Sequence, residues 1–456
     1  MHHRLVPVVA GLAFGLVLLA HAQANEEDGR AVIPDPLTLP VALELIDALH
    51  PDLLAADAGR ARAEADRLDA ESLTGLEADV RARLRWVEPN DQAAIRDHDD
   101  HALTLNVRKR LTDFGFSDAR LAASAASDAG AGFAYAAALR DQRLAVFRAY
   151  FDVVEADLEA AWQSEAMQVE FLRNEDIVEQ RGLLERSELE VLRADADYRL
   201  ALARSSTAEA AQRTTRQMLA QVLNRPRQLP SVVVRPELPL LERPVPEDVF
   251  PLIDEALANN SGLRALEARM RAAEEAFAAA RKADGPVLDA EGEMGTYTRE
   301  LGGNDDVRVG LVLTVPLSSG GRTQAGIARA RAALLDAQAE RGQRELAVRR
   351  QVLKLWQDLG LARYHRAEAK ANMDLRDLEL ERSRMQFAQE VQSNLGNASA
   401  NYTEAEYRLA RADHDLAMAW LRLDALLGRE ITLALNNTPS APSGDAGGTK
   451  DGGAQP

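Results

Sequence analysis

Residues 76–86 read LEADVRARLRW, a stretch in which every second residue is apolar and every residue between is charged. Strict alternation predicts a β-strand with one apolar and one charged face. Residues 103–111, LTLNVRKRL, alternate in the same way, with Lys109 as the one polar residue on the apolar side. Strands of roughly 9–11 residues with two such faces can cross a membrane between lipid and a water-filled lumen. An amphipathic sheet lying on a soluble protein core is the alternative.

Two further runs alternate less sharply, LDAEGEM at 288–294 and VRVGLVLTVPL at 307–317. The sequence therefore predicts four strands, over 76–87, 102–112, 287–298 and 307–317. Four strands cannot close a membrane barrel, because the smallest barrels have about eight strands and open edges are not tolerated in lipid. If these strands cross a membrane, several protomers must share one barrel.

The pairs of strands belong to an internal repeat. The segment ADYRLA at 196–201 returns as AEYRLA at 405–410, and Leu53 of the first half matches Leu263 of the second. This period is far too long for a solenoid unit and indicates duplication of a whole structural half. We place the first repeat at 38–230 and the second at 246–430, joined by a proline-rich linker at 231–245.

Long helices are predicted between the strands. No proline occurs between Pro89 and Pro226 or between Pro316 and Pro439, and both gaps are rich in Ala, Arg, Glu and Leu. Helical hairpins are expected at 117–224 and 322–428, each with one helix roughly 100 Å long. Shorter helices are expected at 38–72 and 246–283, so that two short helices stacked end to end flank each long one. Their wide polar faces favour a curved wall around water, although a coiled-coil scaffold is the alternative.

The composition bears on the compartment. Residues 1–24 carry an apolar stretch and resemble a signal peptide, followed by a linker at 25–37. No later stretch is apolar enough to span a membrane as a helix, so membrane insertion would require strands. The absence of cysteine excludes disulfides, thiolate metal sites and a lipid anchor. The net charge of −18 argues against nucleic acid, and residues 431–456 indicate a disordered tail.

The sequence offers little support for catalysis. The run from Asp97 to His101, DHDDH, is the only cluster with metal-ligand character, but it lies between two predicted strands where charged residues are common. Residues 205–207 lie inside a predicted helix without a glycine elbow, and no phosphate-binding loop is present. We therefore predict no enzyme activity, no cofactor and no metal site, and we expect any energy for transport to come from a partner.

Several short segments together resemble the TolC-like outer-membrane efflux proteins. Residues 37–39 (LTL) and 48–53 (ALHPDL) resemble the opening helix of that family. Residues 111–115 (LTDFG) and 315–321 (VPLSSGG) resemble its two strand-to-helix turns. The resemblance covers nearly all of residues 37–430, and it depends on the order and duplicated spacing of the segments. The turn residues that it marks are Asp113, Phe114, Gly115, Pro316, Gly320 and Gly321.

The resemblance implies an α+β membrane protein with long antiparallel helical hairpins and four transmembrane β-strands per protomer. A homotrimer would share one twelve-stranded barrel in outer-membrane lipid and extend a helical tunnel through the periplasm. Such a duct passively exports small molecules, or polypeptide in type I secretion, together with a periplasmic adaptor protein and an inner-membrane pump. A soluble periplasmic scaffold or adaptor is the alternative, but an adaptor needs lipoyl-like and barrel domains around a single hairpin.

The resemblance also assigns adaptor docking to the hairpin tips. The residues concerned are Gly182, Leu183, Leu184, Ser187, Glu188 and Leu189 in the first tip and Val391, Gln392, Ser393, Asn394 and Leu395 in the second. Small and polar residues at a tip let the chain turn and offer backbone groups to a partner helix. Glu390 stands where the first repeat has Gly182, which departs from the glycine common in the family.

Overall fold

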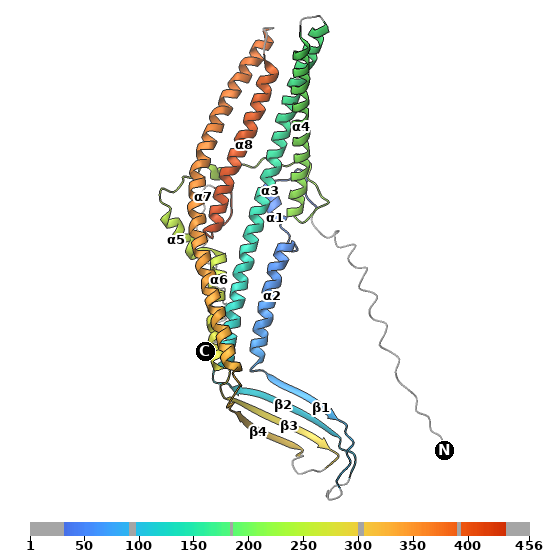
Figure 1. The fold of residues 1–456 in the computed structure, drawn as a ribbon, viewed down its shortest axis with the longest axis vertical. Coiled ribbons are helices and arrows are strands. Elements are labelled where there is room, and N and C mark those ends of the chain that lie inside the picture. Colours follow the sequence, from blue (N-terminus) through green and yellow to red (C-terminus); the bar gives the residue numbers. More distant parts are fainter. Residues whose placement is uncertain (1–31, 91–96, 183–185, 300–304, 390–393, 435–456) are drawn as a thin grey trace, which may run out of the picture.

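The computed structural model describes residues 32–90, 97–182, 186–299, 305–389 and 394–434. The molecule is elongated, with a small sheet at one end and the tips of two helical hairpins at the other (Figure 1). The predicted signal peptide at 1–24 lies outside the described residues, as does most of the predicted tail. Long helical hairpins joined to a four-stranded sheet agree with the coarse fold class that the sequence predicts.

The sheet is a simple antiparallel meander. Its strands are β1 (Leu76–Arg83), β2 (Ala102–Thr112), β3 (Val287–Tyr297) and β4 (Val307–Thr314), in the order β1-β2-β3-β4. Leu76 pairs with Lys109, Lys109 with Ala290, and Ala290 with Leu311, so the apolar positions of all four strands share one face. Sequence alternation therefore determined the register, because a slip by one residue would mix the two faces.

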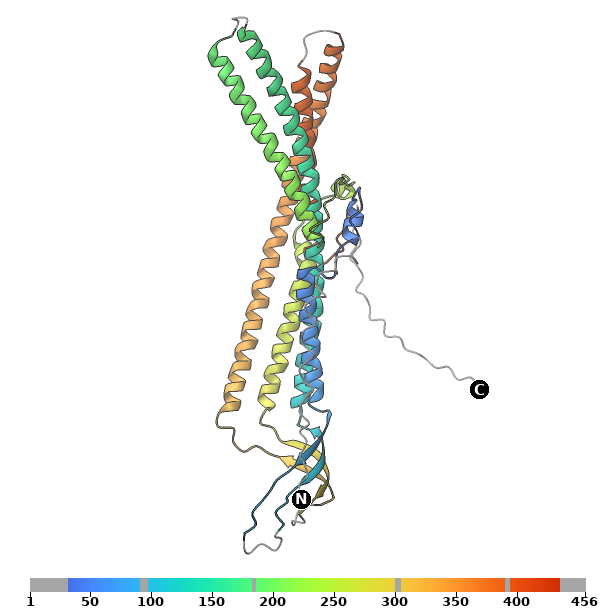
Figure 2. The ribbon, with the colours of Figure 1, turned by 90° about the vertical axis from the view of Figure 1, so that its right-hand side faces the viewer.

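The two longest elements are helices of 67 residues each, α3 (Phe116–Gly182) and α7 (Arg322–Ala388). The antiparallel partner of α3 is α4 (Glu188–Val222), and that of α7 is α8 (Leu395–Leu426). Beside the sheet-proximal halves of the long helices lie α2 (Pro51–Ser72) and α6 (Ser261–Lys282) (Figure 1). Figure 2 shows the two hairpins diverging toward their tips.

The shorter helices stack end to end, α4 on α2 and α8 on α6. At the second junction the side-chain amide of Asn260, before α6, donates to the carbonyl of Leu426 at the end of α8, at 3.1 Å. Gly428 (φ 74°) turns the chain away after α8, as Asn224 (φ 57°) does after α4. Adding a Cβ to Gly428 would bring it to 2.5 Å from the carbonyl oxygen of Asn259, so this close approach requires glycine.

The largest hydrophobic core lies at the level of these junctions, midway along the molecule. It contains the large, fully buried side chains Phe147, Tyr150 and Phe151 of α3 and Trp420 of α8. Small elements of both repeats and of the linker cover it: α1 (Leu39–Glu44), the 3-10 helix η2 (Pro239–Glu242) and α5 (Phe250–Asn259). The guanidinium of Arg243 lies over the indole ring of Trp420, 4.7 Å from the ring centroid, in a cation–π contact. We call this core, with the small elements that cover it, the waist of the molecule, and both hairpins extend from it.

The structure changes several predicted boundaries. The helix predicted over 38–72 is two helices, α1 and α2, because Pro51 opens α2 and holds His50 extended. The helix predicted over 246–283 is likewise interrupted, since Asn260 is extended and its side chain caps the amide of Leu263 at 3.0 Å. A capping residue must leave the helical conformation, and neither break disturbs the hydrophobic pattern from which the helices were predicted.

The strands are shorter than predicted at three ends. β4 ends at Thr314, two residues before Pro316, which has no amide hydrogen for the ladder. β3 ends at Tyr297, one residue before the predicted limit. β1 ends at Arg83 rather than at residue 87, although an isolated bridge between Trp86 and Asp99 continues the pairing.

No helix in the described part of the chain combines the length and apolarity that a membrane-spanning helix needs.

Candidate functional site

The two faces of the sheet differ sharply in chemistry. One face exposes apolar side chains in every strand, including Leu76 and Val80 of β1, Leu103 of β2 and Val309 and Leu311 of β4. Val309 is 82% exposed, far beyond what a residue in a soluble core would show. A continuous exposed apolar surface of this kind marks contact with another protein or with lipid.

The opposite face is charged and largely paired across the strands. Arg108 of β2 contacts Glu291 of β3 at 2.7 Å, and Arg308 of β4 contacts Glu293 at 3.0 Å. These pairs border a cavity of about 450 Å³ that also contacts Asp79 of β1. Cross-strand pairs of opposite charge stabilise the register, and a face of this kind suits water.

The turns that lead from the sheet into the long helices are built alike in the two repeats. Phe114 (φ 56°) and Gly115 (φ 92°) adopt left-handed backbone before α3, and Gly320 (φ 60°) and Gly321 (φ 84°) do so before α7. Pro316 lies just beyond β4 and precedes the second turn. The predicted turn residues therefore all lie at the two places where a strand becomes a long helix.

Each turn is held by a carboxylate. Asp113 accepts from the Ser117 amide at 3.0 and 3.1 Å. Burial opposes ionisation of Asp113, but the hydrogen bonds from Ser117 and the charge of Arg110 outweigh it and lower the pKa of this carboxyl. In the second turn, hydrogen bonds from the hydroxyls of Thr323 and Ser319 lower the pKa of Asp284.

The tip of the first hairpin is closed by a capping box. The Ser187 hydroxyl accepts from the Glu190 amide at 3.4 Å, and the Glu190 carboxylate accepts from the Ser187 amide at 2.9 Å. Glu188 and Leu189 follow in the first turn of α4, and the Leu189 side chain is 76% exposed. Gly182 is the last residue of α3, whereas the predicted residues Leu183 and Leu184 lie outside the described residues.

The second tip is built differently. Asn394 precedes α8 without capping it through its side chain, although the Asn397 side chain donates to it. Leu395 opens α8, and Val391, Gln392 and Ser393 lie outside the described residues. The described tip residues thus end up at the far end of the molecule from the sheet, where the sequence predicts them (Figure 1).

The hairpins meet along a seam between α3 and α8 that sequence reasoning missed. Glu155 of α3 contacts the ring Nδ1 of His414 of α8 at 3.0 Å, and His414, only 2% exposed, stacks on Phe151 with ring centroids 4.4 Å apart. Closer to the tips, Trp162 of α3 stacks on Tyr407 of α8 at 5.7 Å. A histidine within the apolar stripe of an amphipathic helix was the available signal, but nothing in the sequence names its partner.

Cavities border this seam. One of about 770 Å³ extends from Trp162 and Tyr407 toward α7, and one of about 340 Å³ lies beside Asp152, His414 and Asp415. Burial and the neighbouring Glu155 carboxylate raise the pKa of Asp152 and of Asp415. The seam therefore joins the hairpins through stacked rings and titratable groups, with water-accessible space beside it.

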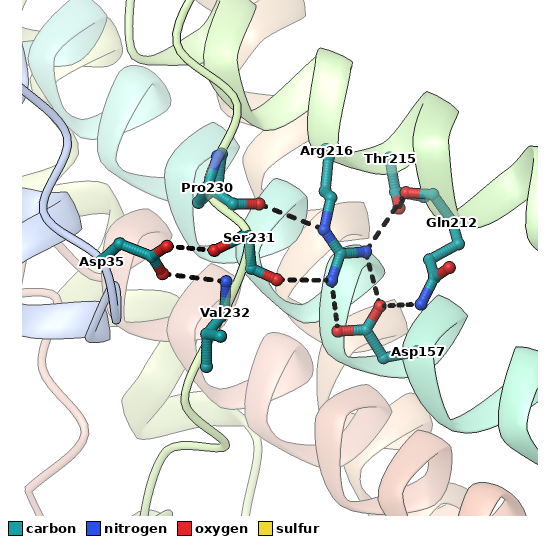
Figure 3. A network of polar contacts seen from close by, with 8 residues as sticks. All are labelled: Asp35, Asp157, Gln212, Thr215, Arg216, Pro230, Ser231 and Val232. Carbon is teal, nitrogen blue, oxygen red and sulfur yellow. Dashed lines mark hydrogen bonds and ion pairs between the residues drawn. The ribbon is translucent and has the colours of Figure 1, made fainter.

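The first hairpin also contacts the segment that leads into the linker between the repeats. Figure 3 shows Arg216 of α4, which contacts Asp157 of α3 at 2.5 and 2.9 Å and donates to the carbonyls of Pro230 at 3.1 Å and Ser231 at 3.3 Å. The carboxylate of Asp35 accepts from the Ser231 hydroxyl and from the Val232 amide. The N-terminal segment, the linker and the first hairpin thus form one polar network.

The side chains of the DHDDH run at 97–101, for which no metal site was predicted, have separate partners. Asp100 is buried against Arg85, and His98 stacks on Trp86 at 5.4 Å. Across the described residues, no group of three or more histidine, aspartate or glutamate side chains is arranged to hold a metal ion.

The comparisons with known proteins agree with this architecture. Residues 252–429 match the model of the family described as Outer membrane efflux protein. The match confirms the predicted resemblance, and it supports the outer-membrane exit duct over the soluble adaptor. No curated protein sequence matches the chain.

Solved structures extend the likeness of fold to both repeats. The outer membrane protein VceC of Vibrio cholerae has a TM-score of 0.67 at 17% identity, over 86% of this chain and 96% of that one. The Campylobacter jejuni CmeC outer membrane channel has a TM-score of 0.69 at 15% identity, over 86% of this chain and 85% of that one. A membrane protein from Pseudomonas aeruginosa reaches 0.70 at 19% identity, over 86% and 93%. The chain therefore shares the fold of these membrane proteins over most of its length.

Proposed function

We propose that three copies of this chain form the outer-membrane exit duct of a tripartite export complex. The observation that carries the proposal is the two-faced sheet, whose exposed apolar face accompanies a strand order that leaves β1 and β4 at its edges. Edge strands with unpaired backbone groups are costly in lipid. If β4 of one copy pairs with β1 of the next, three sheets close a twelve-stranded barrel with its charged faces around water.

The helical part would continue this barrel as a tunnel through the periplasm. The long helix α7 carries exposed apolar side chains that suit packing against a neighbouring copy, including Leu335, Leu346, Leu353, Leu361 and Leu375. In this assembly the signal peptide at 1–24 directs export, and the chain is held in the outer membrane by its barrel rather than by a lipid anchor. Transport is passive and involves no chemistry by the duct itself.

The hairpin tips would dock a periplasmic adaptor that is attached to an inner-membrane pump. The capped start of α4 presents Ser187, Glu188 and Leu189 in a fixed geometry, and the exposed Leu189 offers an apolar contact. Gly182, Leu183 and Leu184 complete the proposed first docking tip, and residues 391–395 form the second. The cargo is a small molecule or a secreted polypeptide.

The test compares the same substitution on the two faces of one strand. Val309→Arg places a charge on the apolar face of β4, whereas Val312→Arg places it on the charged face, where residue 312 pairs with Asp289. A charge in lipid costs about 2–4 kcal/mol near the membrane midplane, so we expect Val309→Arg to abolish outer-membrane recovery and the control to retain it.

The oligomeric state of the same proteins is then measured by gel electrophoresis with and without heating. We expect the wild type and Val312→Arg to sediment with outer membranes and to run as heat-sensitive trimers. Recovery of the wild type as a soluble periplasmic monomer, or equal behaviour of the two variants, would contradict the proposal.

A further inference from the structure

A cavity lies at the junction where α8 ends on α6, in the second repeat. Its volume is about 380 Å³, and four helices contribute to it: α3, α6, α7 and α8. The side chains that matter here are Arg140 of α3, Ser261 at the start of α6, Arg344 and Lys354 of α7, and Arg422 of α8. The cavity therefore lies at a point where both hairpins and the second short helix meet.

The cavity has an excess of positive charge. Lys354 is neutralised by Asp358 at 2.5 Å. Within the described ranges, no carboxylate lies within ion-pair distance of Arg140, Arg344 or Arg422. The one acidic residue that lines the cavity is Asp141, which forms no ion pair with these arginines within 4.0 Å. Burial raises the pKa of its carboxyl, and the charge of Arg344 opposes that rise only in part, so one carboxyl faces three guanidinium groups.

Arg140 is the least satisfied of these cations. One terminal nitrogen, Nη1, is buried and has no hydrogen-bond partner among the described residues, while Nη2 donates to the Gly428 carbonyl at 3.5 Å. Burial, together with the charges of Arg264 and Arg143, lowers the pKa of the Arg140 guanidinium. Arg140 as a whole is only partly buried, but its buried Nη1 without a partner is costly, and an anion in the cavity would reduce that cost.

The first turn of α6 adds neutral donors. Its amides point out of the helix start, the region of positive dipole, and the turn contains no acidic residue. Ser261 is only 7% exposed, and its hydroxyl has no hydrogen-bond partner within the described chain. The hydroxyl oxygen remains accessible from the cavity, so it can donate a hydrogen bond to a group that lies there.

The internal repeat provides an independent comparison. The start of α2 in the first repeat reads His50-Pro51-Asp52-Leu53, and the start of α6 reads Asn260-Ser261-Gly262-Leu263. Asp52 supplies a carboxylate in the first turn of α2, but Gly262 stands at the corresponding position of α6. A Cβ built on Gly262 would lie 3.2 Å from Nη2 of Arg344. The second repeat thus has a glycine and a nearby arginine where the first has its own carboxylate.

We infer that this cavity binds a small oxyanion, a phosphate, sulfate or carboxylate group, between the start of α6 and Arg140, Arg344 and Arg422. Guanidinium groups and first-turn amides both bind such oxygens through charge-assisted hydrogen bonds. The anion is either a free ion or the acidic group of a larger molecule. When bound, it links α3, α6, α7 and α8 at the waist from which the hairpins emerge.

The experiment uses inorganic phosphate and the full-length chain, purified in detergent. Binding is measured by calorimetry, and thermal midpoints are compared in phosphate and in chloride of equal ionic strength. We expect saturable binding and a raised midpoint for the wild type in phosphate only, because a ligand of the folded state stabilises it. Arg344→Gln and Gly262→Asp should each weaken binding at least tenfold. The aspartate reproduces the first repeat and supplies the missing carboxylate.

The matched control is Arg349→Gln on the same helix, since Arg349 is paired with Glu345 at 2.9 Å and does not line the cavity. This variant should bind phosphate as the wild type does. Absence of phosphate binding by the wild type, or equal binding by all four proteins, would overturn the inference.

A competition arm then distinguishes the source of the oxyanion. If a phosphate monoester displaces inorganic phosphate, the cavity accepts the acidic group of a larger molecule, and if it does not, the ligand is the free ion. Either result keeps the oxyanion site, and neither depends on membrane insertion or trimer formation. The test can therefore succeed or fail separately from the proposed function.

Discussion

The two hairpins are tied to the waist by ion pairs of opposite polarity. In the first, the acid Asp157 is on the long helix α3 and Arg216 is on the shorter helix α4. In the second, Arg366 is on the long helix α7 and Asp413 is on the shorter helix α8, at 2.8 Å. Both arginines also reach the linker, Arg216 through carbonyls and Arg366 through Glu242 of η2 at 3.2 Å. We call each of these ion pairs an anchor. Both repeats have an anchor that joins a hairpin to the linker, but the acidic and basic residues have exchanged helices.

The difference teaches how two similar hairpins can remain distinct. An exchange of partners would bring Asp157 toward Asp413 or Arg216 toward Arg366, and like charges at close range are unfavourable. The anchors also differ in burial. The Arg216 side chain is 16% exposed and has a dense set of acceptors, whereas Arg366 is 26% exposed and one of its partners, Glu242, is 71% exposed. We therefore expect the first anchor to contribute more stability.

Truncating the two arginines should produce the largest effect. Arg216→Ala removes the counter-charge of the Asp157 carboxylate, to which Gln212 still donates at 2.9 Å. It also removes the donor to the carbonyls of Pro230 and Ser231, and we expect a total cost of about 3 kcal/mol. Arg366→Ala should cost about half as much, because Asp413 keeps Arg235 at 3.7 Å. Thermal midpoints of the purified variants measure the difference. Equal losses would mean that the two anchors are energetically equivalent despite their different burial.

The strand-to-helix turns of the two repeats should also differ in their tolerance of alanine, with a smaller effect on stability. A Cβ at Gly115 would lie 2.8 Å from the Lys282 Nζ, so the lysine must shift and weaken its hydrogen bond to the Gly115 carbonyl, which is 3.1 Å long. A Cβ at Gly321 would meet nothing within 4 Å, and both positions have the backbone strain of a positive φ. We expect Gly115→Ala to cost about 2 kcal/mol and Gly321→Ala about 1 kcal/mol, since the second has only the conformational cost. A larger loss for Gly321→Ala in thermal unfolding would contradict this order.

The tips should differ in local stability. Ser187→Ala removes the cap of α4 and should cost about 1 kcal/mol, whereas Asn394→Ala removes no side-chain cap from α8. Amide hydrogen exchange should therefore speed up in the first turn of α4 but change little in the first turn of α8. Similar changes at both tips would indicate that Asn394 has a capping role that its geometry does not provide.

The seam between the hairpins should give the smallest effect, and one that depends on pH. Asp415 faces Glu155 and Arg148 of α3 and lies near His414, Arg411 and Arg422 of its own helix. Because its folded-state pKa is raised, its contribution is present below the ordinary carboxyl pKa and is lost as pH rises through the raised value. Asparagine does not ionise, so the Asp415→Asn variant does not lose this stability as the pH rises.

The thermal midpoint of the Asp415→Asn variant should therefore rise relative to the wild type between acidic and neutral pH. A difference between the two proteins that is independent of pH would show that ionisation of Asp415 does not act on the seam.

Much of the fold follows from local patterns. Alternation at 76–86 predicts both the strand and its two faces, and the register from Leu76 to Lys109 retains them. The helical hairpins follow from the proline-free gaps, whereas the turn before α3 was predicted from the resemblance of residues 111–115 to the family's strand-to-helix turn. The breaks at His50 and Asn260 were not predicted, because a cap interrupts the backbone without interrupting the hydrophobic period.

The sequence by itself determined the repeat, the amphipathic strands, the long helices and the places where strands become helices. These features depend on neighbouring residues, so local periodicity is sufficient to reveal them. Only the tertiary structure decided which distant groups meet: Glu155 with His414, Asp157 with Arg216, and the three arginines around the start of α6. Each of these contacts joins helices far apart in the chain, and helical periodicity carries no information about which faces of two distant helices pack together.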